Sequence, residues 1–293
     1  MNKALAEIIA GFIPHKMTRN RWRGILRFGP INALKLKSML KREKNTPTKY
    51  YLTVCAIAKN EGPYFDEWIE WHRKMGVEKF YIYDNESADN TQEVLAPYVE
   101  SGLVEYVYWK GRKQQLPVYD DCLNKRRLEA RWMAVIDLDE FIVPMKDKTI
   151  PDFLKRFENF SAVEINGLIY GSDGAKTKEP GGVMERFKRH SIPNHRFNRH
   201  IKSIVNPRRV FCFTGAHETS RISGSAADSH GQPVTINFRD REPQQDVIRL
   251  NHYMVKSYEE FMVKHHRGSA RGADKRFSLE YFNKFDLNDI KEE

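Results

Sequence analysis

Between residues 50 and 136 the sequence alternates four times between short apolar runs and stretches with helical spacing. Strands that alternate with helices in this way form parallel sheets with right-handed crossovers. The runs are almost continuously apolar, as expected of strands that are buried on both faces. We therefore predict an α/β fold with strands at 50–57, 79–83, 104–109 and 134–136, and with helices opening at Gly62-Pro63, after Ser87-Ala-Asp89 and over about 114–131.

The pattern changes after about residue 145. Short β-prone pieces are separated there by polar or glycine-rich loops, and one helix is expected over about 258–267. This part is predicted to be a mixed α+β half of the same compact domain. The domain then spans 50–293, with a mostly parallel, Rossmann-like half at 50–145 and the mixed half at 146–293. The β-prone pieces are 161–165, 209–213, 233–238 and 246–250.

Almost all of the net charge of +10 lies in an N-terminal arm. Residues 1–45 hold eleven Lys and Arg against two acids, which gives +9 and leaves +1 for the rest. Apolar side chains such as Trp22, Phe28 and Leu36 are interleaved with these cations. Such a segment suits the surface of an anionic membrane. A solvated arm, or a helix packed on the domain, is the second interpretation, and nucleic-acid binding is ranked last and not expected. Residues 1–49 are thus predicted to be a basic amphipathic arm and linker.

Several absences define the expected location. No apolar run reaches the roughly 18 residues that a membrane-spanning helix needs. Glu7 interrupts the first apolar stretch, which argues against an export signal. The three cysteines are far apart and match neither a disulfide framework nor a zinc cluster. We expect a cytoplasmic protein that is peripheral on the inner face of the membrane. The cysteines are Cys55, Cys122 and Cys212.

Polar clusters follow three of the predicted strands, where ligands bind in parallel α/β sheets. Asn60-Glu61 follows the first strand, Asp84-Asn85 the second, and Asp137-Leu-Asp139-Glu140 the fourth. In extended chain Asp137 and Asp139 would face the same side, and two such close carboxylates become tolerable beside a divalent cation. A solvated acidic turn is the simpler explanation. A phosphatase of the haloacid type is set aside, because its D-x-D normally follows the first strand.

Four motifs follow one another along the chain: Ala56-Ile-Ala-Lys-Asn-Glu61, Glu67-Trp-Ile-Glu-Trp-His72 with Gly76-Val77, Tyr81-Ile-Tyr-Asp-Asn-Glu-Ser87 and Ile136-Asp-Leu-Asp-Glu-Phe141. Together they resemble motifs of bacterial glycosyltransferases of the family 2 and family 92 type. The resemblance covers roughly residues 50–267. It implies a GT-A fold, a nucleotide-diphosphate sugar donor bound in the first half, an acceptor bound in the second half, a Mn²⁺ or Mg²⁺ ion, and inversion at the anomeric carbon.

The resemblance suggests roles for these polar clusters. Asp139 is the expected direct metal ligand, whereas Asp137 reaches the metal, a metal-bound water or the ribose. Lys59, Glu61, Asp84 and Asn85 are expected around the nucleotide. Glu61 is equally explained as an acid that favours a helix N-terminus. Asp84-Asn85 is equally explained as an ordinary turn.

Further candidates lie in the second half. GT-A enzymes commonly complete the metal shell with a histidine, and His252 is favoured over His217. Lys256, four residues after His252, is placed to neutralise the donor diphosphate. An inverting transfer also needs a general base for the acceptor hydroxyl. The sequence offers Asp173, Glu185 and Glu218 for that base without ranking them.

The function expected from these observations is transfer of a hexose from a nucleotide-diphosphate sugar to a glycan or lipid-linked acceptor, in surface polysaccharide synthesis. A sugar-phosphate nucleotidyltransferase is an alternative. It is disfavoured because only Lys59 and Gly62 stand where a glycine-rich basic loop would be needed. A non-catalytic binding protein with a basic arm is the second alternative.

Overall fold

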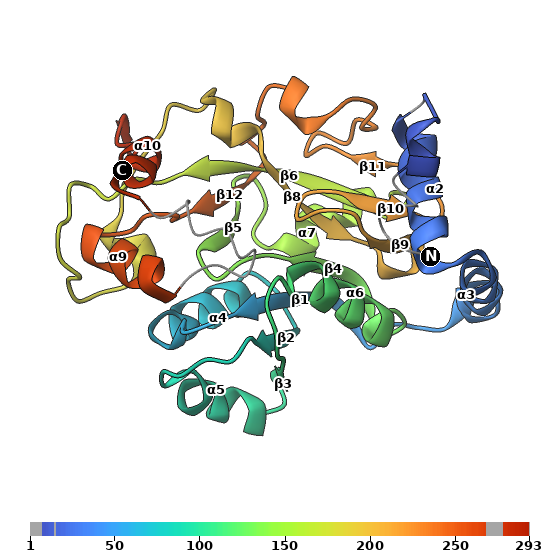
Figure 1. Ribbon diagram of the computed structural model, residues 1–293, viewed down its shortest axis with the longest axis horizontal. Coiled ribbons are helices and arrows are strands. Elements are labelled where there is room, and N and C mark those ends of the chain that lie inside the picture. The colour runs from blue at the N-terminus through green and yellow to red at the C-terminus, as the bar shows by residue number, and fades with distance from the viewer. Residues whose placement is uncertain (1–7, 15, 268–277, 293) are drawn as a thin grey trace.

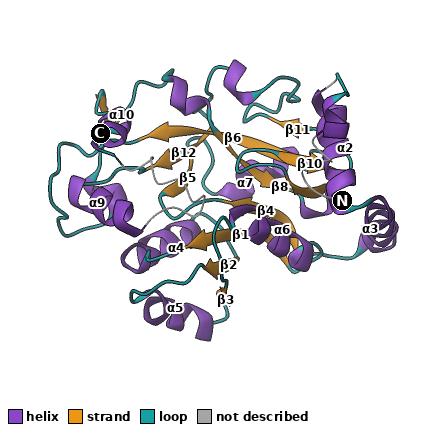
Figure 2. Ribbon diagram, in the orientation of Figure 1, coloured by secondary structure: helices purple, strands orange, loops and turns teal. Residues whose placement is uncertain are grey.

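A nine-stranded sheet runs through the molecule in the order β3-β2-β1-β4-β8-β6-β12-β5, with β11 added beside β6 (Figures 1 and 2). The computed structural model describes residues 8–14, 16–267 and 278–292. The predicted α/β class is confirmed. The strands are β1 (Tyr50–Ala58), β2 (Lys79–Asp84), β3 (Val104–Tyr108), β4 (Ala130–Val135), β5 (Glu140–Pro144), β6 (Ala162–Ile169), β8 (Ile201–Val205), β11 (Ala226–Ala227) and β12 (Ile248–His252).

The first four strands are parallel, with β1 between β2 and β4. Successive side chains of β1 enter two different cores, because neighbouring residues of a strand point to opposite faces. Leu52, Val54 and Ala56 pack with helices α4 and α5, whereas Cys55 and Ile57 pack with α6. Both faces of this half are therefore covered, which explains its continuous apolar runs. The helices are α4 (Phe65–Lys74), α5 (Thr91–Glu100) and α6 (Gln115–Arg126).

Two helix boundaries differ from the prediction. Gly62-Pro63 opens a single 3₁₀ turn, Gly62–Tyr64, and α4 begins only at Phe65. The helix expected up to residue 131 ends at Arg126, because Glu129 N–H turns back to the Arg126 carbonyl and β4 starts at Ala130.

The second half contributes antiparallel strands to the same sheet. β8 lies between β4 and β6 and is antiparallel to both, and β12 is parallel to β6 but antiparallel to β5. The sequence did not predict β5 or β8. The β-prone piece at 233–238 is not a strand: Pro233 has no N–H to donate, and the segment makes one isolated bridge before a 3₁₀ turn at Phe238–Asp240. The pieces at 161–165, 209–213 and 246–250 overlap β6, β9 (Val210–Phe213) and β12, respectively.

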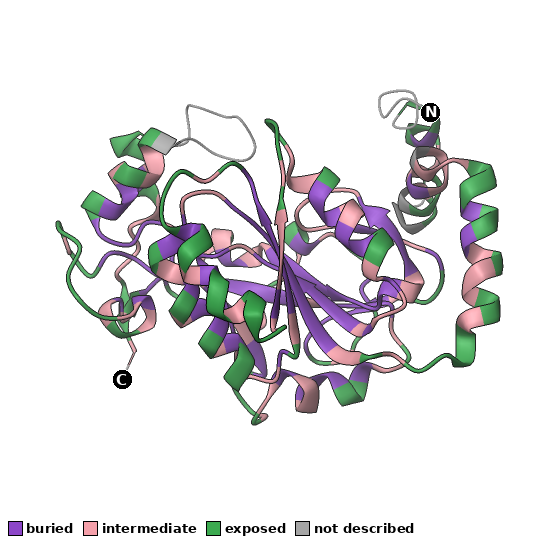
Figure 3. Cartoon of the chain, turned by 90° about the horizontal axis from the view of Figure 1, so that it is seen from below, coloured by how far each residue is buried: buried purple, intermediate pink, exposed green. Residues whose placement is uncertain are grey.

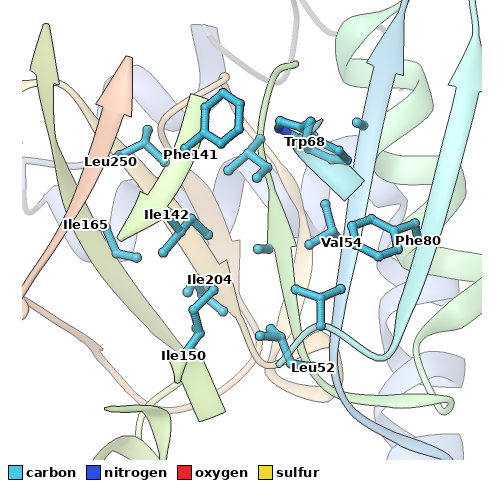
Figure 4. Close-up of a cluster of buried hydrophobic side chains, with 14 of the residues drawn as sticks. Leu52, Val54, Trp68, Phe80, Phe141, Ile142, Ile150, Ile165, Ile204 and Leu250 are labelled. Atoms are coloured by element: carbon cyan, nitrogen blue, oxygen red, sulfur yellow. The ribbon is translucent and has the colours of Figure 1, made fainter. Parts of the chain in front are cut away.

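One apolar cluster joins the two halves. Figure 4 shows Val54, Phe80 and Trp68 of the first half in the same cluster as Ile165 and Leu250 of the second. All of these are at most 2% exposed. Figure 3 shows the buried sheet enclosed by helices whose outer faces are exposed. The remaining elements are α7 (Ile150–Leu154), α8 (Val183–Arg186), β7 (Arg189–His190), α9 (Tyr258–Arg267), α10 (Leu279–Phe285) and β13 (Ile290–Lys291).

The N-terminal arm forms two helices, α2 (Lys16–Phe28) and α3 (Pro30–Arg42), at one end of the molecule (Figure 1). They pack on the hairpin of β9 (Val210–Phe213) and β10 (Thr219–Arg221). Leu36 of α3 lies there in a small apolar cluster with the fully buried Phe211. The arm thus packs on the domain, as one of the alternatives expects. Within the residues that the structure describes, no helix is long and apolar enough to cross a bilayer.

Candidate active site

A cavity of about 560 Å³ lies at the carboxyl ends of β1 and β4. Turns that follow β1, β2 and β4 contribute to its lining, and so do β8, β12, α9 and α10. Much of the predicted site is brought together here, from segments almost 200 residues apart in sequence. The predicted residues that line the cavity are Lys59, Glu61, Asn85, Asp137, Asp139, His217 and His252.

The acidic motif lies in a turn rather than in extended chain, because β4 already ends at Val135. The Glu140 carboxylate accepts the Asp137 N–H at 2.9 Å and closes this turn. Asp137 also accepts from the Tyr119 hydroxyl at 3.3 Å. The same-face geometry expected of a strand is therefore replaced by a turn that still directs Asp137 and Asp139 to the cavity.

A buried lysine that the sequence did not single out neutralises part of this motif. Lys202, on β8, is 3% exposed, and its Nζ lies 2.8 Å from Asp137 Oδ2 and 3.0 Å from Glu140 Oε2. Burial opposes ionisation of Asp137, but the Lys202 ammonium holds its pKa below the ordinary value. Burial raises the pKa of Glu140 in spite of the same ammonium. The one available signal was a lysine inside the apolar run Ile201–Val205.

Asp139 has a different set of neighbours. Lys264 of α9 forms an ion pair with Asp139 Oδ2, and His252 Nε2 lies 3.6 Å from Oδ1. Burial opposes ionisation, but Lys264 and His252 hold the pKa of Asp139 well below its usual range. Burial disfavours the charged form of His252, but the Asp139 carboxylate raises the pKa of this histidine above the ordinary value. In the described ranges, no three His, Cys, Asp or Glu side chains are grouped to hold a metal ion. Asp139 and His252 are nevertheless an oxygen and a nitrogen donor that face one cavity.

His217 lines another part of the cavity. Its Nδ1–H donates to the Ile201 carbonyl at 2.6 Å, which fixes the tautomer and leaves Nε2 as the proton-accepting nitrogen. Its ring lies 5.3 Å from that of His200, centroid to centroid. Its main neighbours are thus β8 and His200, whereas His252 lies directly beside Asp139.

The predicted nucleotide residues divide into two groups. Lys59, Glu61 and Asn85 line the cavity. The Asn85 amide is fixed, because its Nδ2 donates to the carbonyls of Trp109 and Gly111, both at 3.0 Å. Asp84 does not line the cavity. Its carboxylate accepts from the Ser87 N–H at 3.0 Å and from the Tyr106 hydroxyl at 2.5 Å, which shapes the turn after β2.

The other predicted residues lie outside the cavity lining. Lys256 is 4% exposed, with Nζ 3.6 Å from the centroid of the Tyr64 ring. Asp173 has a positive φ of 54° and accepts the N–H groups of Lys188 and Arg189, so its carboxylate fixes a loop. The structure does not bring the three candidate bases together at the cavity. The two others are Glu185, on α8, and Glu218, just before β10.

Aromatic side chains form a wall that the sequence analysis missed. Phe197, Tyr281 and Phe285 line the cavity. The ring of Phe285 lies 4.6 Å from Phe197 and 4.5 Å from Tyr281, centroid to centroid. Two of these residues come from α10, which lies beyond the resemblance and offered no motif. We call Lys59, Lys264 and the Asp137–Glu140 turn the charged side of the lining, and these three aromatic residues its aromatic side.

The chain is similar to proteins of a known family. The sequence profile of glycosyltransferase family 92 matches residues 50–293. A family 92 protein of Arabidopsis thaliana (At1g27200) is 27% identical over 246 residues, which cover 80% of this chain and 40% of that protein. The β-1,4-galactosyltransferase galt-1 of Caenorhabditis elegans is 24% identical and matches 76% of this chain and 53% of its own length. The chain thus spans about 40% of the length of the first curated relatives that it matches.

Two further similarities are more partial. Galactan β-1,4-galactosyltransferase GALS2 of Arabidopsis thaliana is 29% identical over 175 residues, which cover 54% of this chain and 33% of that protein. Among solved structures, S. aureus TarS in complex with UDP superposes with a TM-score of 0.37 at 13% identity, over 54% of this chain and 47% of that chain.

Proposed function

The chain belongs to glycosyltransferase family 92, and from this premise we propose that it transfers a hexosyl group from a nucleotide-diphosphate sugar to a glycan or lipid-linked acceptor. The observation that carries the proposal is the cavity whose lining combines the Asp137–Glu140 turn with three aromatic side chains. A transferase for two sugars needs both surfaces: a charged one for a diphosphate and a ring-shaped apolar one for a sugar face.

The charged side is proposed to hold the donor. Lys59 and Lys264 line it as cations that attract a diphosphate, while Glu61 and Asn85 lie where the base and ribose would be bound. Lys202 pairs with Asp137 and Glu140 and keeps that turn in place. In this assignment Asp137, whose side chain is 31% exposed, accepts a hydrogen bond from a ribose hydroxyl in addition to those from Tyr119 and Lys202.

Asp139 and His252 are the residues proposed to hold a Mn²⁺ or Mg²⁺ ion. They supply one carboxylate oxygen and one imidazole nitrogen, 3.6 Å apart, and such donors suit both ions. A bound divalent ion would stabilise the negative charge that develops on the leaving diphosphate. Lys264 now pairs with Asp139 and would have to share or release that carboxylate.

The aromatic side is proposed to hold the acceptor. Phe197, Tyr281 and Phe285 offer flat apolar surfaces on which the hydrophobic face of a sugar ring can stack. Relatives named as β-1,4-galactosyltransferases favour galactose as the sugar and a galactan-like glycan as the acceptor. A β-linked product from an α-linked donor requires one displacement with inversion, and hence a general base at the cavity.

The proposed location is the inner face of a membrane, where a lipid-linked or surface glycan is built. The basic arm supports this proposal, because it carries +9 and packs on the domain while Phe12, Ile31 and Leu34 stay 68–85% exposed. Apolar side chains exposed among cations suit the membrane–water interface.

A panel of nucleotide sugars tests the enzymatic proposal. Full-length protein is incubated with UDP- and GDP-sugars, with and without Mn²⁺, and the products are separated. We expect release of UDP or GDP that depends on the metal and is abolished by Asp139→Asn. Asp246→Asn, which removes an exposed ion pair far from the lining, is the matched control and should keep activity.

Two other products would contradict the proposal. Release of pyrophosphate would identify a nucleotidyltransferase instead. Metal-dependent binding of a nucleotide sugar without release of a nucleoside diphosphate, in the presence of a panel of oligosaccharide acceptors, would identify a binding protein.

A further inference from the structure

A second cavity, of about 520 Å³, lies between the N-terminal helices and the β9–β10 hairpin, far along the chain from the donor residues. We call it the arm groove. Its lining comes from three separate elements, because α2, α3 and β10 meet there. Its lining includes Arg21 and Trp22 of α2, Lys37 of α3, Arg221 at the end of β10, and Ser223 just after that strand.

The arm groove is cationic. Arg21, Lys37 and Arg221 contribute three positive charges, and the described residues that line it include no Asp or Glu. Glu164 and Glu218 lie near Arg221 and offset part of its charge, and Glu164 also pairs with Arg241. An anion bound in the hollow would still be attracted by the cations that line it.

The arm groove is also fixed in shape. Gly24 of α2 lies directly on Ser220 of β10, so closely that a Cβ at residue 24 would come within 1.9 Å of Ser220 Oγ. At the other end of the arm, Arg208 Nη1 donates to the carbonyls of Glu43 at 3.1 Å and Thr46 at 2.8 Å. These contacts hold α2 and α3, which carry Arg21 and Lys37, on the hairpin that carries Arg221, so binding requires little reorganisation of the backbone.

Apolar side chains lie at the edge of the arm groove. Trp22 lines it and remains 45% exposed, and Leu34, one helical turn before Lys37, is 68% exposed. Ile31, one helical turn before Leu34 in α3, is 70% exposed. A soluble anion needs cations alone, whereas a lipid offers a phosphate for the cations and acyl chains for the exposed apolar residues.

We propose that the arm groove binds the phosphate of an anionic phospholipid headgroup, with Trp22, Ile31 and Leu34 entering the adjacent membrane interface. The inference deepens the proposed membrane location and is independent of the sugar-transfer reaction. The occupant is a membrane lipid and not a soluble phosphate, because the cationic hollow and the exposed apolar side chains are adjacent. Arg221 is the informative residue, since it belongs to β10 and not to the basic arm.

Vesicle co-sedimentation of the full-length protein tests the proposal. Binding is measured on vesicles of phosphatidylcholine alone and of phosphatidylcholine with phosphatidylglycerol. Each cation near an anionic surface is expected to contribute roughly fivefold in affinity. Arg21→Gln with Lys37→Gln should therefore weaken binding to the anionic vesicles by about 25-fold. The control Lys74→Gln with Lys155→Gln removes the same charge at exposed sites outside the arm groove and should change binding by less than about threefold.

Arg221→Gln distinguishes lipid binding in the arm groove from non-specific attraction of the basic arm to the anionic membrane. The proposal expects it to weaken binding roughly fivefold, with a melting temperature that shows the protein is folded. Unchanged binding of folded Arg221→Gln, or equal loss in the Lys74/Lys155 control, would overturn the arm groove as the site. If Arg221→Gln does not fold, Ser223→Asp, which places a negative charge in the same hollow, takes its place.

A competition experiment identifies the source of the phosphate. Soluble glycerol phosphate is added at increasing concentration at constant ionic strength. Retained vesicle binding supports a lipid held by both headgroup and apolar contacts, and full displacement at low millimolar concentration would overturn it. None of these measurements uses a nucleotide sugar, so their failure leaves the proposed transferase activity to its own test.

Discussion

Replacing Lys202 by methionine keeps most of the side-chain volume and removes the ammonium that Asp137 and Glu140 share. Lys202 and Glu140 are each 3% exposed, so water cannot replace the lost charge for Glu140. Water can still solvate the Asp137 carboxylate, because 31% of this side chain is exposed. Removing one partner of a buried ion pair costs about 3–5 kcal/mol. We expect a loss of that size in the free energy of unfolding at pH 7, which most domains survive because they start with about 5–15 kcal/mol.

The assay is urea unfolding at pH 7 and again at lower pH. Without the ammonium, burial raises the pKa of both carboxyls above their values in the unfolded chain. The folded variant then binds more protons than the unfolded one, and its stability rises as the pH falls. Wild type has the opposite dependence through Asp137, whose lowered pKa gives stability above the unfolded pKa that is lost as the pH falls. The difference in free energy of unfolding between wild type and Lys202→Met should therefore decrease from pH 7 toward about pH 4.

Lys146→Met is the matched control. Lys146 pairs with Asp246 at 2.9 Å, but both side chains are more than half exposed, so its loss should cost at most about 1 kcal/mol. Adding Glu140→Gln to Lys202→Met should restore part of the stability. The reasoning is refuted if Lys202→Met is as stable as the control at pH 7, or if its deficit grows on acidification.

Three further outcomes follow from the site and the core. His252→Ala should weaken Mn²⁺-dependent UDP binding, measured by calorimetry, at least tenfold (about 1.4 kcal/mol), whereas His217→Ala should leave the metal dependence unchanged; the reverse ranking would exchange the two assignments. Burial lowers the pKa of His72 to about 4, so the free energy of unfolding should fall by about 3 kcal/mol as the pH drops from about 6.5 to about 4. Unfolding curves of His72→Gln should lack this pH dependence. A pH profile identical to that of wild type would argue against this role of His72. Phe285→Ala should raise KM for a glycan acceptor several-fold with little change in donor hydrolysis, and an equal effect on both would place the aromatic wall at the donor instead.

The first half of the fold was predictable because its information is local. Each strand from β1 to β4 is a short apolar run between turn residues, and a helix with apolar residues at helical spacing follows β1, β2 and β3. Polar residues that follow β1, β2 and β4 line one cavity at one edge of the sheet, whereas Asp84 does not. Sequence position therefore led to Lys59, Glu61, Asn85 and the Asp137–Glu140 turn at the cavity.

The second half was less predictable because its pairings are long-range. β8 carries Lys202 and Ser203 between apolar neighbours, and only its pairing with β4, 65 or more residues away, explains why a lysine is buried there. β5 begins at Glu140, which the sequence analysis interpreted only as part of the acidic motif and not as the start of a strand. Asp173 was chosen from a glycine-flanked loop, but backbone N–H groups from residues 188 and 189 occupy its carboxylate, and no local pattern indicates that contact.

The position of β8 also bears on how the chain is made. β4 is complete at Val135, but its neighbour in the finished sheet ends at Val205, 70 residues later. At about 5–20 residues per second, a ribosome needs roughly 4–14 s to supply the missing strand. During that interval the parallel half would present the bare edge of β4, a template for pairing with other nascent chains. Chaperone occupancy of the emerging polypeptide should accordingly be highest between these two points of synthesis.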